Sequence, residues 1–210
     1  LGIRKPDYFL DVVGKNLGET LGNVISKSYK ILKNLDPDSL LILGDTNSSL
    51  SVISAKRLKI PIFHMEAGNR CFDQNVPEEI NRKIADHLAD INLTYTENSR
   101  RYILSEGFRK DHVFNTGSPM PEIIENFKKN IDESKILSQL NLKKKKYIEA
   151  SIHREENIDI GNNFKEILNS LKLFEETYNL PIIFSTHPRT KEKLNIIKVI
   201  KSSKINFIKP

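Results

Sequence analysis

The stretch HMEAGNRCFDQNVPEEINR, residues 64–82, gathers ionisable side chains of several kinds beside a short apolar run. It holds a histidine, three glutamates, an aspartate, two arginines and the single cysteine of the chain. Carboxylates and imidazoles are the groups that most often move protons in enzymes, because their pKa values can be tuned toward neutral pH. This stretch is therefore the first candidate for a site of proton transfer.

Further polar residues follow the other apolar runs, at the points where predicted strands end. Ligands of open parallel α/β sheets bind in the crevice beyond the carboxyl ends of the strands. We therefore expect these residues to converge on one crevice. They are Asp45, Thr46 and Asn47; His64 and Glu66; Thr96 and Glu97; Gly117 and Ser118; His153 and Arg154; and His187 and Arg189.

Each of these groups taken singly has a structural alternative. An N-cap role for the next helix would by itself explain Asp45. A favourable interaction with a helix dipole would by itself explain Glu78. His153 can belong to a charged surface cluster, and His187, which precedes a proline, to a turn at the end of a strand. Their equivalent positions along the fold favour a shared site over these separate explanations.

The elements that would position these residues alternate along the whole chain, strand pattern with helix pattern. That alternation is typical of an α/β protein with parallel sheets and crossover helices. The apolar runs predict strands at 39–44, 60–65, 91–95, 112–115, 146–151, 180–185 and 205–208, with helices near 48–58, 77–88, 98–105, from 121, 162–178 and 189–200.

The helix at 77–88 has the clearest signals. Pro77 suits the first helical position, and acidic residues follow it in the first turn. Ile80, Ile84 and Leu88 recur every four residues, which predicts that they form the buried face.

The composition changes after residue 130 to a polar, lysine-rich stretch, which we interpret as a helix and linker over 131–145. The chain is therefore predicted to contain two Rossmann-like, doubly wound domains, one over residues 1–140 and the start of another over 141–210. Two such domains facing each other would form a cleft between their strand ends.

Composition excludes several classes of protein. The formal charge of +6 comes largely from scattered lysines, so we expect no nucleic-acid partner, whereas an anionic small substrate suits this balance. The single Cys71 excludes an internal disulfide and a cysteine zinc motif, and indicates a reducing compartment. No apolar segment approaches the ~20 residues of a membrane span. We expect a cytoplasmic protein without membrane contact.

Six motifs occur in the order and approximate spacing of one known family: GDTNSSL, HMEAGNR, PEEINRKIADHLAD, YTENSRRYILSEG, TGSP and IHREEN. In these motifs the chain resembles the non-hydrolysing UDP-N-acetylglucosamine 2-epimerases along nearly its whole length. The resemblance implies a GT-B-like fold, two Rossmann-like domains with the nucleotide sugar between them. It further implies a homodimer that needs no cofactor and no metal.

Within that family, EAGNRCFDQNVPEEINR and TGSP are more similar to the UDP-N-acetyl-L-fucosamine synthases. This branch inverts C2 of UDP-2-acetamido-2,6-dideoxy-L-talose on a route to capsule or O-antigen. The alternative is the interconversion of UDP-N-acetylglucosamine and UDP-N-acetylmannosamine.

The resemblance also implies roles for individual residues. The family expels UDP from C1 as the C2 proton leaves, and then returns both on the opposite face of a bound 2-acetamidoglycal. Asp45, Glu66 and Glu78 match the acid–base carboxylates, and His153 a further catalytic or phosphate-contacting residue. Substrate-binding roles fall to His187, Arg70, Arg82, Arg154 and Ser118.

Both predicted domains are incomplete by comparison with the family, because its first nucleotide-binding loop and its later strands have no counterpart in the chain. We therefore expect the chain to be the middle of the enzyme and inactive by itself. Two alternatives are a glycosyltransferase of the same architecture and a catalytically inert nucleotide-sugar-binding fragment.

Overall fold

The structure is a computed structural model that describes residues 4–152, 154–187, 190–191, 194 and 204–209. The chain divides into two compact units, residues 1–124 and 125–210. The sequence had placed the boundary at residue 140. The intervening stretch carries only short helical pieces, α6 (Lys128–Asp132) and α7 (Ile136–Gln139).

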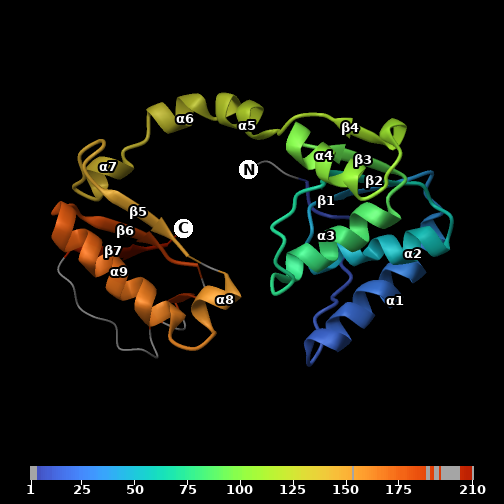
Figure 1. The fold of residues 1–210 in the computed structure, drawn as a ribbon, viewed down its shortest axis with the longest axis horizontal. Helices are drawn as coiled ribbons and strands as arrows, with labels where there is room; N and C mark the ends of the chain where they lie inside the picture. Colours follow the sequence, from blue (N-terminus) through green and yellow to red (C-terminus); the bar gives the residue numbers. More distant parts are fainter. Residues whose placement is uncertain (1–3, 153, 188–189, 192–193, 195–203, 210) are drawn as a thin grey trace. The chain divides into compact units, whose positions relative to one another are not determined.

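The first unit contains a parallel sheet whose strands follow one another in chain order (Figure 1). Its strands are β1 (Leu40–Leu43), β2 (Ile62–Ala67), β3 (Ile91–Thr94) and β4 (Val113–Asn115). Since the strands run parallel, their carboxyl ends lie at one edge of the sheet, as the sequence predicted.

Helices connect these strands as crossovers. The helical segments of this unit are α1 (Leu17–Leu35), η1 (Asn47–Leu50), α2 (Ser51–Arg57), α3 (Pro77–Leu88), α4 (Glu97–Ser105), η2 (Lys110–His112) and α5 (Met120–Asn126), the last of which crosses the boundary between units.

One face of the first sheet is covered by helices. Ile42 and Ile62 pack there against Val52 of α2 and Ala85 of α3, and burying such side chains stabilises the unit by about 1.5–3 kcal/mol each. On the opposite face Leu41 and Leu43 are 61% and 63% exposed. The described residues of this unit therefore supply one of the two helix layers of a doubly wound sheet.

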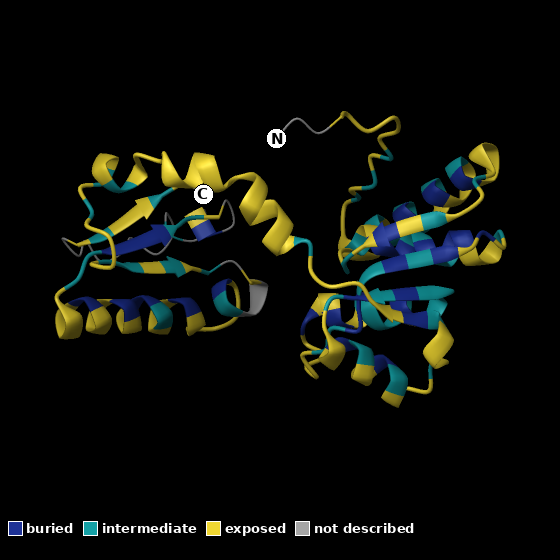
Figure 2. Cartoon of the chain, turned by 90° about the horizontal axis from the view of Figure 1, so that it is seen from above, coloured by how far each residue is buried: buried dark blue, intermediate teal, exposed yellow. Residues whose placement is uncertain are grey.

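The second unit holds another parallel sheet, β5 (Ile148–Ser151), β6 (Ile182–Ser185) and β7 (Ile205–Ile208), in that order. Helices α8 (Glu155–Ile158) and α9 (Asn163–Tyr178) cover one face. Figure 2 shows the buried side of α9 facing the strands and its exposed side facing away.

The apolar patterns predicted these elements well. Every predicted strand forms, and the predicted helix over 77–88 is confirmed at both ends. The helix predicted over 189–200 lies largely outside the described residues. Helix α1 was not anticipated, although Asn16 caps it by accepting a hydrogen bond from the backbone N–H of Glu19 at 2.9 Å.

The predicted buried face of α3 is partly wrong. Ile84 and Leu88 do pack against the core, but Ile80 is 48% exposed. The helix instead buries the carboxylates of Glu79 and Asp86, whose charges are matched by arginines from the same unit.

Among the described residues, no helix is both long and apolar enough to cross a lipid bilayer.

Candidate active site

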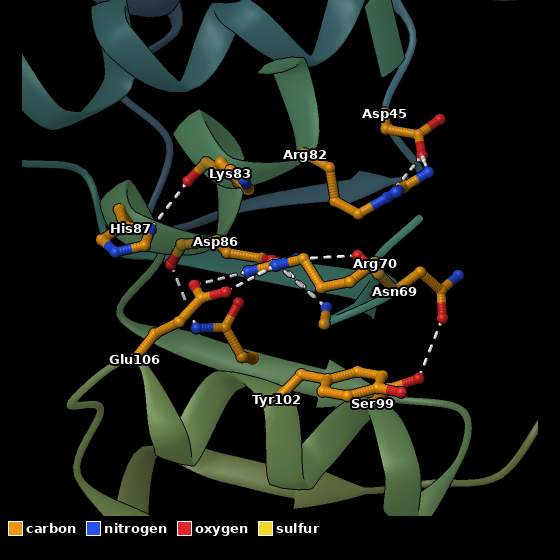
Figure 3. Close-up of polar contacts among 12 residues, drawn as sticks. Asp45, Asn69, Arg70, Arg82, Lys83, Asp86, His87, Ser99, Tyr102 and Glu106 are labelled. Atoms are coloured by element: carbon orange, nitrogen blue, oxygen red, sulfur yellow. Dashed lines mark hydrogen bonds and ion pairs between the residues drawn. The ribbon is translucent and has the colours of Figure 1, made fainter. Parts of the chain in front are cut away.

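Asp45 lies directly after β1, where the chain turns at Gly44 with a φ of 72°. Arg82 of α3 points toward it (Figure 3), and its Nε donates to Asp45 Oδ2 at 2.8 Å. The same guanidinium donates through Nη1 to Glu79 Oε2 at 2.6 Å. Asp45 is 20% exposed at its side chain, so it remains accessible while an arginine fixes its orientation.

Glu66 occupies an unusual backbone position within β2. Its φ is 68°, in the left-handed region that L-residues avoid, and the register between β2 and β3 shifts between Met65 and Ala67. Such a bulge re-aims a side chain and is frequent near active sites. The structure thus turns the Glu66 side chain away from the regular alternation of the strand.

The Glu66 carboxylate lies beside the backbone that carries Asp45. A Cβ added at Gly44 would stand 3.5 Å from Glu66 Oε2, and Asn69 Nδ2 donates to Glu66 Oε1 at 3.4 Å. Burial and the nearby charge of Glu66 raise the pKa of Tyr95. Neighbouring strand ends therefore place the Glu66 carboxylate beside Gly44, the residue that precedes Asp45.

The two adjacent glutamates at the start of α3 have opposite environments. Glu78 is exposed in the first turn. Glu79 is fully buried and accepts hydrogen bonds from the backbone N–H groups of Cys71 and Phe72, at 3.2 and 3.3 Å. Burial alone would raise the pKa of Glu79, but these bonds and the charge of Arg82 outweigh it, and the pKa lies below its usual value.

His64 does not take the place expected from the sequence. We predicted that it would join the crevice beyond the strand ends, but it lies within β2 and is fully buried. Its Nδ1 is 2.8 Å from Asp86 Oδ1, and its Nε2 is 3.0 Å from the carbonyl oxygen of Gly44. His64 lies two residues after Ile62 in the regular part of β2, so its side chain points to the same helix-covered face.

Arg70 is likewise engaged inside the unit (Figure 3). Its Nη1 donates to Asp86 Oδ2, and its Nε and Nη2 donate to the two oxygens of Glu106, all at 2.7 Å. Burial would lower the pKa of Arg70, but Glu106 and Asp86 together hold it above its usual value. Its side chain is only 1% exposed.

The remaining predicted site residues are distributed over both units. Ser118 follows β4, is exposed, and accepts a hydrogen bond from the backbone N–H of Met120 at 3.2 Å. Arg154 and His187 are exposed residues of the second unit, beyond the ends of β5 and β6. His153 lies outside the described residues. Across the described part of the chain, no group of three or more acidic, histidine or cysteine side chains is placed to hold a metal ion.

Sequence reasoning missed the buried carboxylate Asp86 and the exposed Glu106, both of which bind Arg70. One signal was available, because Glu79 and Asp86 stand at i and i+7 and so share one face of α3. A helix that carries two acids on its core-facing side needs buried cations to match them. The partner in space, Arg70, is remote enough along the chain that no local pattern names it.

The side chains of this arrangement are of the types that can exchange protons. Asp45 and Glu66 lie at adjacent strand ends, and Glu78 stands at the start of the helix that carries the arginine bound to Asp45. Carboxylates held in different surroundings can divide the roles of proton donor and acceptor.

Comparison with known proteins places this site in context. The family model described as UDP-N-acetylglucosamine 2-epimerase matches residues 1–210. The chain is 40% identical over 208 residues to a UDP-N-acetylglucosamine 2-epimerase homolog of Methanococcus maripaludis, covering 96% of this chain and 57% of the relative. It is 33% identical to the UDP-2,3-diacetamido-2,3-dideoxy-D-glucuronate 2-epimerase of Pseudomonas aeruginosa, covering 91% and 53%.

Solved structures show the same fold. The UDP-N-acetylglucosamine 2-epimerase of Rickettsia bellii superposes with a TM-score of 0.89 at 52% identity, covering 99% of this chain and 55% of that one. The Methanocaldococcus jannaschii UDP-GlcNAc 2-epimerase, in complex with UDP-GlcNAc and UDP, has a TM-score of 0.87 at 30% identity, covering 99% and 59%. The chain thus spans between half and two thirds of the length of these relatives.

Proposed function

The chain belongs to the UDP-N-acetylglucosamine 2-epimerase family, and from this premise we propose that the complete protein inverts C2 of a UDP-activated 2-acetamido sugar. The substrate sits where the strand ends of the first unit gather their carboxylates. The GT-B-like fold that the chain shares with its relatives supports a nucleotide-sugar substrate.

The reaction proceeds by elimination and re-addition. A carboxylate takes the proton from C2 while the C1–O bond to UDP breaks, and the electron pair forms the C1–C2 double bond of a 2-acetamidoglycal. A carboxylic acid on the other side then returns a proton to C2, and a UDP oxygen rebuilds the bond to C1. The two steps balance, so the reaction consumes no co-reactant.

The observation that carries this proposal is the position of Glu66. Its left-handed backbone and the bulge in β2 bring its carboxylate beside Gly44, next to Asp45. Two acids at neighbouring strand ends suit a proton exchange between two faces of one carbon. Glu78 supplies the third carboxylate from the first turn of α3, where it is exposed.

The cationic and polar residues take supporting roles. Arg82 orients Asp45, and Arg70 acts through Asp86. We assign His153, Arg154, His187 and Ser118 to the substrate, with the histidines and Arg154 near the pyrophosphate, where cations stabilise the charge that develops as UDP departs.

The sugar that we propose is UDP-2-acetamido-2,6-dideoxy-L-talose, giving UDP-N-acetyl-L-fucosamine for capsule or O-antigen. The loop at 66–82 and the TGSP motif support this choice through their resemblance to that branch. UDP-N-acetylglucosamine is the alternative, supported by the names of several relatives.

The experiment is an incubation of the complete protein with each UDP-sugar in deuterated water. We expect deuterium at C2 of substrate and product with the L-talose sugar, and slower exchange with UDP-N-acetylglucosamine. The reverse order would assign the alternative substrate. Absence of deuterium at C2 with every UDP-2-acetamido sugar would exclude epimerisation and leave a glycosyltransferase or an inert binding fragment.

We further propose that the complete protein works as a homodimer in the cytoplasm. The single cysteine suits a reducing compartment. Light scattering of the purified complete protein at micromolar concentration tests the assembly, and a monomer mass would contradict it.

A further inference from the structure

The buried pair His64–Asp86 touches the backbone on both sides of Glu66. His64 precedes Glu66 by two residues and Gly68 follows it by two. Asp86 Oδ1 faces His64 Nδ1 at 2.8 Å, and the N–H of Gly68 donates to both Asp86 oxygens, at 3.3 and 3.2 Å. One side chain of α3 therefore holds both flanks of the bulge that carries Glu66.

The same histidine reaches the neighbouring strand end. His64 Nε2 lies 3.0 Å from the carbonyl oxygen of Gly44, the residue before Asp45. Position 68 also requires glycine, because a Cβ there would stand 2.4 Å from the carbonyl oxygen of Ser99. The segments that bear both carboxylates are thus fixed through one imidazole ring.

His64 and Arg70 meet at the Asp86 carboxylate. A backbone carbonyl oxygen only accepts, so Nε2 is the donor in the contact between His64 and Gly44. Asp86 faces His64 Nδ1 and also accepts from Arg70 Nη1 and from the N–H of Gly68, so one carboxylate joins α3 to β2 and to the loop that carries Arg70.

We propose that Asp86 and His64 are positioning residues of the reaction, which hold Glu66 and Asp45 at the mutual distance that proton transfer at C2 requires. This inference rests on the proposed function. Neither residue touches the substrate, and both act through the backbone of residues 44 and 64–68. A displacement of about 1 Å at a reacting group can slow a reaction about 100-fold.

The first test compares two carboxylate variants in the complete protein. Asp86→Asn leaves the side-chain volume nearly unchanged. It replaces one carboxylate oxygen by an amide N–H₂, which cannot accept, and so weakens the bonds from Gly68 and Arg70. Glu106→Gln is the matched control, because it removes a carboxylate from the other side of the same Arg70 and touches none of residues 44 and 64–68.

We expect kcat for C2 exchange to fall about 100-fold in Asp86→Asn, with KM and UDP affinity close to wild type. In Glu106→Gln we expect both parameters to stay near wild type, measured at a temperature where each variant is folded. A wild-type kcat in Asp86→Asn, or an equal fall in both variants, would overturn the inference and indicate a purely structural network.

A second pair of variants decides the matter if Asp86→Asn fails to fold. The amide of His64→Gln reaches toward Gly44 in place of Nε2, and the amide of His64→Asn reaches toward Asp86 in place of Nδ1. We expect kcat to fall in both while KM holds, because each loses one of the two ties. Wild-type kcat in both would contradict the positioning role.

The nitrogen-15 spectrum of histidine-labelled protein gives a readout without turnover. We expect the signals lost in His64→Gln to show an Nε2 that carries a proton and donates a hydrogen bond, and an Nε2 without a proton would contradict the contact with Gly44. A wild-type protein without C2 exchange would instead refute the proposed function. Normal wild-type exchange with unaffected variants would refute only this inference.

Discussion

Both sheets pack against helices through apolar clusters, but the first unit adds a network of buried ion pairs. In the first unit, β2 and α3 completely bury three ionisable side chains, His64, Glu79 and Asp86, each with a charged partner. In the second unit, α9 and β6 meet through an apolar cluster that includes Phe164 and Phe184.

This difference shows that the contacts that stabilise a fold and the contacts that fix the positions of its side chains need not be the same. Apolar packing is not directional, so an apolar cluster accepts small shifts of its members. A buried ion pair contributes little net stability over an apolar equivalent, but its hydrogen bonds fix the partners in one geometry. The first unit therefore holds its strand ends rigidly where the carboxylates of the candidate site lie.

The largest effect should come from breaking the charged network. Arg70→Met leaves the buried Asp86 without its guanidinium partner, and we expect the free energy of unfolding to fall by about 3–5 kcal/mol in urea titration. Arg109→Met is the control, because Arg109 pairs with Asp111 on the surface. Equal stability of the two variants would erase the contrast between buried and exposed pairs.

Removing apolar volume from the second unit should cost nearly as much. Leu168 of α9 is 3% exposed, and Leu168→Ala should lower the free energy of unfolding by about 2–5 kcal/mol through the cavity it leaves. Leu173→Ala on the same helix, at a position 63% exposed, should change it little. We expect kcat per folded molecule to stay near wild type in Leu168→Ala. A fall in kcat at full folding would show that the geometry of the site also depends on this core.

A smaller loss is expected at the helix that follows β3. Thr96 caps α4 by accepting from the backbone N–H of Ser99 at 3.0 Å, so Thr96→Ala should cost about 1 kcal/mol in thermal unfolding. Thr46 stands at the equivalent position before η1 without a capping bond from its side chain. Thr46→Ala should therefore have the melting temperature of the wild type. A larger fall in melting temperature there than in Thr96→Ala would refute the assignment of Thr96 as the stabilising N-cap.

The smallest effect concerns the pH dependence of the first unit. The pKa of Glu79 is depressed below its ordinary value of 4.5 by its hydrogen bonds and by Arg82, against the opposing effect of burial. The unfolded state then binds the proton more tightly, so the stabilisation is present above about pH 4.5 and is lost as pH falls through the folded pKa. Glu79→Gln should weaken the pH dependence of the melting temperature between about pH 5 and pH 3, measured by calorimetry, and a dependence as steep as in the wild type would contradict this contribution.

Local patterns in the sequence were sufficient for the elements and for the positions of Asp45, Glu66 and Glu78 along them. The Pro77 start of α3 and the strand runs such as IPIFHM depend on neighbouring residues alone, so they could be read without the fold. The resemblance to a family then supplied the chemistry, which spacing by itself left open.

The geometry around those residues could not be predicted, because it depends on contacts remote in sequence. The tie between His64 and Asp86 joins β2 to α3, and that between Arg70 and Glu106 joins a loop to the end of α4. The left-handed conformation of Glu66 also runs against its intrinsic preference and exists only because the surrounding structure enforces it. Ile80 shows the converse, an apolar residue whose periodicity suggested burial and which the charged face of α3 leaves exposed.

Exchange of the C2 hydrogen with deuterated water tests the proposed role of the carboxylates most directly, in the complete protein and in its Glu66→Gln and Glu78→Gln variants. We predict rapid incorporation by the wild type and a loss of about 100-fold or more in both variants, with melting temperatures unchanged within a few degrees. Exchange at the wild-type rate in both folded variants would contradict the account.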